Sequence, residues 1–127
     1  MIELHRRLLD IGGVETCFPG YEEDINNILE YGQTWDVLTT QLKRGEPSQC
    51  HRNAANLWHN NRNSKTFRLI MCTGYALSND GVWRQHSWLI QAKPRANVLI
   101  ETTVPRIAYH GFAMTTEIAK EFEEENY

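Results

Sequence analysis

The stretch EPSQCHRNAANLW, residues 46–58, predicts a loop that runs directly into a helix. Pro47 and Ser48 favour a helix start, because proline fits the first turn and a serine hydroxyl can accept a bond from an unpaired amide. Cys50 then falls in the first turn, where the helix dipole and free N–H groups favour a thiolate over a thiol. Apolar residues follow at i+4, i+7 and i+8, namely Ala54, Leu57 and Trp58. We therefore expect a central helix whose buried stripe begins at a nucleophilic cysteine.

Two later stretches, residues 82–90 (VWRQHSWLI) and 97–103 (NVLIETT), are rich in β-branched and aromatic residues and predict strands. The short polar connection between them contains Pro94, which favours an antiparallel hairpin. A turn centred on Lys93-Pro94 sets His86 opposite Glu101. A register slip by two residues keeps them on one face as diagonal neighbours, whereas a slip by one separates them.

If this shared face packs under the helix start, Cys50, His86 and Glu101 form a nucleophile, a base and a group that orients the base. Glu101 lies in an apolar strand, where a carboxylate must be paired or protonated, and an imidazole is a fitting partner. His51 points about 100° away from Cys50 around the helix, so it is a poor base for its neighbour.

This order of residues resembles the papain-like and transglutaminase-like cysteine hydrolases. The resemblance covers roughly residues 47 to 103: a cysteine at a helix start, a histidine within His86-Ser87-Trp88, and an acidic residue on the next strand. It implies that Cys50 is the nucleophile, His86 the general base and Glu101 the third member. No branch of the superfamily is assigned, since peptidase, amidase, deamidase and transglutaminase activities all fit.

The expected activity is that of a cysteine-dependent acyl hydrolase or transferase, acting on an amide bond through a thioester and needing no cofactor. The Cys50 backbone N–H and the Gln49 side chain are expected to stabilise the oxyanion. Trp88, on the same strand face as His86, and Tyr75 complete the expected substrate cleft. The expected partner is a peptide or another amide-containing substrate.

Two other functions stay open. Cys50, His86 and Glu101, with His110, could hold zinc, although the chain has no tight C-x-x-C or H-E-x-x-H ligand pair. The fold could also serve as a non-catalytic interaction module. Its contact surface would then consist of the aromatic residues Tyr75, Trp83, Trp88 and Tyr109.

The chain has 127 residues with 13 Lys plus Arg and 16 Asp plus Glu, and the resulting net charge of −3 argues against general nucleic-acid binding. Between Lys43 and Arg68, however, Glu46 is the only acid among six basic residues. This basic cluster is either a solvated helix face or a feature that draws an acidic substrate and lowers the thiol pKa. Three cysteines without a C-x-x-C pair predict no disulfide framework.

The sequence shows neither an amino-terminal signal segment nor an apolar stretch long enough to cross a bilayer, so we expect a cytoplasmic protein without membrane partners. Oligomeric state stays open. The pattern predicts one α+β domain over residues 1–127. Helices are expected at 21–31, 34–42, from about 48, and from Thr115 or Thr116. The predicted strands, 67–77, 82–90 and 97–103, form an antiparallel sheet of three or four strands, to which 107–114 contributes a loop or an edge strand.

Overall fold

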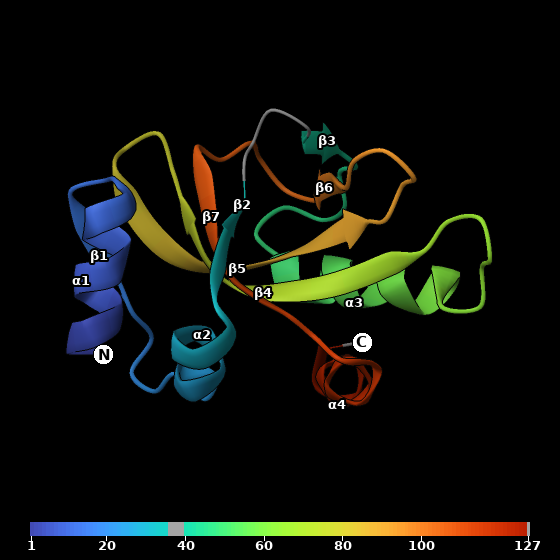
Figure 1. The fold of residues 1–127 in the computed structure, drawn as a ribbon, viewed down its shortest axis with the longest axis horizontal. Coiled ribbons are helices and arrows are strands. Elements are labelled where there is room, and N and C mark those ends of the chain that lie inside the picture. Colours follow the sequence, from blue (N-terminus) through green and yellow to red (C-terminus); the bar gives the residue numbers. More distant parts are fainter. Residues whose placement is uncertain (36–39, 127) are drawn as a thin grey trace.

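The computed structural model describes residues 1–35 and 40–126 (Figure 1). This part of the chain contains four helices and seven strands. The helices are α1 (Ile2–Ile11), α2 (Ile25–Tyr31), α3 (Cys50–Asn61) and α4 (Thr116–Asn126). The strands are β1 (Glu15–Cys17), β2 (Gln33–Trp35), β3 (Thr40–Leu42), β4 (Leu69–Leu77), β5 (Val82–Gln91), β6 (Val98–Glu101) and β7 (Ala108–Ala113).

One curled sheet joins these strands in the order β2-β7-β4-β5-β6-β3, and β1 pairs separately with β5 (Figure 1). The β1–β5 and β3–β6 pairs are parallel and the others antiparallel. The α+β class is therefore confirmed. The expected antiparallel sheet of three or four strands is wrong in size and direction, because three short amino-terminal segments join its edges.

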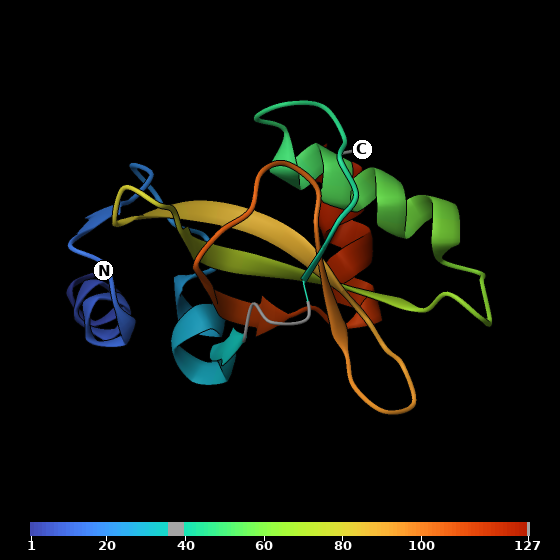
Figure 2. The same ribbon diagram turned by 90° about the horizontal axis from the view of Figure 1, so that it is seen from above.

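The predicted meander of three strands forms the centre of the sheet. Its first turn is the predicted Ser78–Gly81 turn, in which the Ser78 N–H donates to the Val82 carbonyl over 3.1 Å. The strand expected at 67–77 is β4, and it is buried along most of its length, including Cys72. The carboxy-terminal helix also forms as predicted, and α4 packs beside α3 (Figure 2).

The helix expected over residues 34–42 is wrong. Its first two residues lie in β2, which pairs with β7, and its last three form β3, which pairs with β6. Leu38, on which the helical spacing depended, lies outside the described residues. Pairing with distant strand edges outweighs a weak local periodicity, since strand formation depends strongly on tertiary context.

Both faces of the sheet are buried. The larger core lies between one face and the helices, and it includes Leu8 of α1, Ile28 of α2, Trp58 of α3 and Ala119 of α4. The smaller core covers the other face and consists of Cys72, Ala76, Trp88, Ile90, Leu99 and Tyr109, with Trp35 packed against it. Because side chains alternate along a strand, β5 contributes to both cores and positions His86 on the face of the smaller one.

Candidate active site

The candidate site begins with the pairing of β5 and β6. Leu89 lies opposite Ile100 and Gln91 opposite Val98. This register differs by two residues from one in which His86 faces Glu101 directly, so the two side chains are diagonal neighbours on one face. His86 Nε2 lies 2.7 Å from Glu101 Oε1. The contact predicted from strand parity is confirmed, but in the slipped register.

Glu101 is fully buried and accepts four hydrogen bonds. His86 Nε2 and the Tyr109 hydroxyl, at 2.7 and 2.6 Å, donate to Oε1. The backbone N–H and the hydroxyl of Thr103, both at 2.9 Å, donate to Oε2. Burial by itself raises the pKa of this carboxyl, but the bond and charge of His86, with these other donors, lower it to about 2. Glu101 is therefore held as a carboxylate.

His86 packs against two buried aromatic rings that lie side by side, with centroids 5.0 Å apart. Its imidazole stacks on Trp88, with ring centroids 6.1 Å apart and planes at 23°, and lies 6.2 Å from the Tyr109 ring. Burial lowers the pKa of His86, but its bonds with Cys50 and Glu101 raise it above the ordinary histidine value. Trp88 lies on the predicted strand face. However, its side chain is fully buried, so it supports the imidazole and does not line an open cleft.

Cys50, the first residue of α3, lies where one edge of β5 is open. On that edge, β1 pairs as far as Arg84 and β6 begins opposite Leu89, so no described strand covers the four residues between them. Ser78 and Val82 form a hydrogen-bonded pair at the turn between β4 and β5. In an antiparallel ladder only every second residue of a strand bonds its partner strand, so the Ser87 N–H points away from β4, toward the open edge. The Cys50 thiol lies near the Ser87 N–H and the His86 side chain, and both of these groups lower its pKa.

The electrostatics of these groups favour the charged forms. Burial raises the pKa of Cys50, but the hydrogen bond and charge of His86, with the Ser87 N–H, outweigh it and lower the pKa below the ordinary thiol value. The pKa of His86 is raised and that of Glu101 lowered. The three groups thus favour a thiolate, an imidazolium and a carboxylate. Because Nε2 of His86 bonds Glu101, Nδ1 is the nitrogen left for Cys50.

The start of α3 differs from the predicted cap. Gln49, not Ser48, is the N-cap residue, and no side chain of the described residues caps the helix. Ser48 has a φ of 58°, in the left-handed region that non-glycine residues rarely adopt. The N–H groups of the first turn therefore lie uncapped beside Cys50, and the exposed Gln49 side chain lies at the same end.

The structure does not bring Tyr75 to Cys50. Tyr75 lies opposite Gln85 in β4–β5, on the sheet face opposite to that of His86. Its buried hydroxyl donates to Glu22 Oε1 over 2.7 Å. Tyr75 is therefore part of the larger core, and it does not form the substrate cleft as expected.

Sequence reasoning missed several residues that support the site. His51 Nδ1 lies 2.5 Å from the Ser87 hydroxyl, which in turn lies 2.9 Å from the Thr73 hydroxyl. His51 therefore helps to position the strand residue whose N–H lowers the pKa of Cys50. Thr103 carried a weak signal, because it lies two residues after Glu101 and can bond that carboxylate locally. No sequence pattern indicated Tyr109, because it reaches Glu101 only through the pairing of β4 with β7.

The alternative functions find little support in this geometry. Within residues 1–35 and 40–126, no group of three or more His, Cys, Asp or Glu side chains is arranged to hold a metal ion. Both Glu101 oxygens are committed to other donors, and His110 Nδ1 lies 3.0 Å from the Thr34 hydroxyl. The aromatic residues expected to form an interaction surface are all fully buried: Tyr75, Trp83, Trp88 and Tyr109.

Comparison of the chain with protein-family models, with curated proteins and with solved structures finds no match. Among the helices of the described residues, none is both long and apolar enough to cross a membrane.

Proposed function

We propose that this protein is a cysteine-dependent acyl hydrolase or transferase that acts on an amide bond. One observation carries the proposal: a buried, hydrogen-bonded His86–Glu101 pair lies beside Cys50 at the start of α3, and His86 lowers the pKa of the Cys50 thiol. A nucleophile, a base and a group that orients the base, connected in this order, are the parts that acyl transfer requires. The same parts occur in the same chain order in the papain-like and transglutaminase-like hydrolases.

The proposed mechanism follows from these contacts. The Cys50 thiolate attacks the acyl carbon, and the oxyanion that forms accepts hydrogen bonds from the Cys50 N–H and the Gln49 side chain. The His86 imidazolium gives its Nδ1 proton to the leaving amine, and the C–N bond breaks to leave a thioester. Water or an amine then attacks the thioester, giving its proton to His86 and releasing Cys50. Glu101 keeps the imidazole oriented and stabilises its charged form.

The first test is the pH dependence of Cys50 alkylation by iodoacetamide, resolved by mass spectrometry. We expect Cys50 to react well below pH 8.5, roughly the pKa of a free thiol. His86→Ala should slow the reaction about tenfold or more at pH 6, because it removes the cationic partner of the thiolate. Exposed Cys17 and buried Cys72 are internal controls. His86→Asn keeps a hydrogen-bond donor for Glu101, so it is the second variant to test if His86→Ala does not fold.

The second test measures acyl transfer directly. We expect p-nitrophenyl acetate to acetylate Cys50 with a stoichiometric burst of p-nitrophenolate, which Cys50→Ser abolishes while the circular dichroism spectrum stays unchanged. A Cys50 that reacts no faster than Cys17 and is indifferent to His86→Ala would contradict the enzyme proposal. An interaction module would then be the better interpretation.

A further inference from the structure

A pocket of about 270 Å³ lies beside the candidate site. Its walls come from the loop at residues 44–48, which leads into α3, and from residues 103–106, which follow β6. A bond of 2.8 Å from the Gly45 N–H to the Thr102 carbonyl joins the two segments. The pocket is thus built from the two stretches that carry Cys50 and Glu101.

The pocket lies within reach of the proposed reaction centre. Ser48 lines it and lies two residues before Cys50, so their Cα atoms are at most roughly 7 Å apart. Thr103 lines it as well and donates two hydrogen bonds to Glu101. A substrate with its amide at Cys50 would therefore place a neighbouring group in this pocket.

The charge of the pocket is positive. Arg44 and Arg106 both line it, and no Asp or Glu is among its described lining residues. Neither arginine forms an ion pair in the described part of the chain. Among the described residues, the two Nη atoms of Arg106 donate to two hydroxyls, those of Ser78 at 3.4 Å and Thr103 at 3.3 Å.

Arg106 also has an unmet bonding capacity. Its Nε is buried and has no hydrogen-bond partner among the described residues. Because this Nε has almost no accessible surface, an oxygen ligand in the pocket would reach the guanidinium through its Nη atoms. A guanidinium can bind a carboxylate through two parallel bonds, which its present hydroxyl contacts do not provide.

We propose that this pocket binds a carboxylate of the substrate, which selects amides that neighbour an acidic side chain. This inference rests on the proposed function, since it places the carboxylate relative to an acyl group at Cys50. Arg44 and Arg106 supply the charge, and Pro47 and Val104 supply apolar walls for the methylene groups of the acidic side chain. The basic cluster between Lys43 and Arg68 is either a solvated helix face or a feature that draws an acidic substrate. This pocket favours the second interpretation.

The test compares two electrophiles that differ in one charge, iodoacetyl-Glu-NH₂ and iodoacetyl-Gln-NH₂. The measured quantity is the ratio of their alkylation rates at Cys50 divided by the same ratio at exposed Cys17. In the wild type we expect this quotient to be about ten, because a charge-assisted bidentate bond favours the acidic probe. Arg44→Gln and Arg106→Gln should each reduce it by about threefold or more.

Arg95→Gln is the matched control, because it removes the same charge from an exposed position in the β5–β6 connection. It should leave the quotient unchanged. Arg106→Lys keeps the charge but loses the fork, so an intermediate quotient is expected. Circular dichroism of each variant checks the fold, and exposed Arg44 provides a site where substitution disturbs no core contact.

The outcomes separate the two proposals. If the neutral probe reacts at Cys50 no faster than at Cys17, the proposed function fails. If it reacts fast but the quotient is near one, or falls equally in Arg95→Gln, the carboxylate pocket is refuted and the proposed function stands.

Discussion

At the scale of single residues, the candidate site depends on one buried charge. Glu101 has no exposed surface, and its two oxygens accept bonds from an imidazole, a phenol, a backbone N–H and a hydroxyl. A carboxylate satisfied in this way fixes the position of every donor around it. His86 is consequently held in one orientation.

Glu101→Gln should disfavour the charged form of His86 and reduce the stability of the folded protein. Without the carboxylate the His86 imidazolium is less favoured, so the midpoint of Cys50 alkylation should move to higher pH. The imperfectly satisfied amide should also lower the free energy of unfolding by about 1–3 kcal/mol at pH 7. Urea denaturation measures this loss, and Glu30→Gln on the exposed face of α2 is the control.

The pH dependence of this stability loss follows from the direction in which folding shifts the pKa of Glu101. The folded-state pKa of Glu101, about 2, lies below its ordinary value of 4.5, so its stabilisation is present above pH 4.5 and is lost as the pH falls toward 2. The difference between wild type and Glu101→Gln should therefore shrink over this range. A difference that is constant from pH 7 to pH 2.5 would show that the carboxylate charge does not stabilise the fold.

At the scale of elements, β4 and β7 approach each other unusually closely. Gly74 lies opposite Gly111, and a Cβ at Gly74 would lie 2.3 Å from the His110 carbonyl oxygen and 2.4 Å from the Gly111 Cα. Backbone atoms cannot give way as a flexible side chain does. The two glycines therefore let β7 place Tyr109 against Glu101 while Gly74 pairs with His86 on the other side.

Gly74→Ala should lower the free energy of unfolding by about 2 kcal/mol or more, because the added methyl group forces the two strands apart. It should also slow Cys50 alkylation at pH 6, since the displaced Tyr109 no longer holds Glu101. Gly20→Ala is the matched control, because no atom of the described residues lies within 4 Å of a Cβ at that position. Equal urea midpoints for the two variants would contradict the close strand approach.

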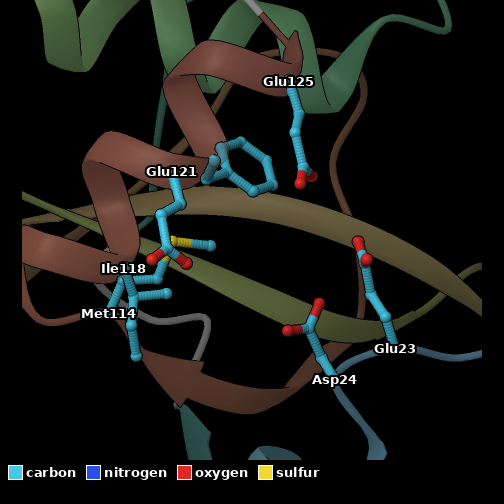
Figure 3. Close-up of a pocket in the computed structure, with 7 residues that line it drawn as sticks. Glu23, Asp24, Met114, Ile118, Glu121 and Glu125 are labelled. Atoms are coloured by element: carbon cyan, nitrogen blue, oxygen red, sulfur yellow. The ribbon is translucent and has the colours of Figure 1, made fainter.

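At the scale of the whole molecule, acidic side chains from distant segments face one another. A pocket of about 120 Å³ has Glu23 and Asp24 on one side and Glu121 and Glu125 of α4 on the other (Figure 3). Burial, followed by the charges of Glu22, Glu23 and Glu125, raises the pKa of Asp24 to about 6. Burial of Asp24, together with these nearby charges, therefore makes its ionised form unfavourable in the folded protein at neutral pH.

Asp24→Asn should stabilise the protein by about 1 kcal/mol at pH 7, a value reduced for solvent screening because Asp24 is only partly buried. A raised carboxyl pKa makes ionisation unfavourable in the folded state, so the gain should grow between pH 4 and 6 and vanish below pH 4. Urea denaturation at pH 7 and pH 4 measures it, with Asp10→Asn as the control. A gain of equal size at both pH values would exclude the electrostatic cause.

Much of the candidate site could be predicted from local patterns. Alternation along a strand determined which residues share a face, so His86 and Glu101 met even though the register slipped by two residues. The apolar spacing after Cys50 predicted α3, and the turn residues after β4 predicted its hairpin with β5. Each of these features joins residues within one element or in two elements that follow each other along the chain.

The sequence by itself therefore determined the central helix, the three-stranded meander and the shared face of His86 and Glu101. Only the tertiary structure decided that β2 and β3 complete a mixed sheet, that Tyr109 bonds Glu101, and that Arg44 and Arg106 line one pocket. It also decided that one edge of β5 stays open for Cys50. The physical reason is range: helices and turns follow from neighbouring residues, whereas strand partners and pockets depend on segments tens of residues apart that meet only when the chain packs.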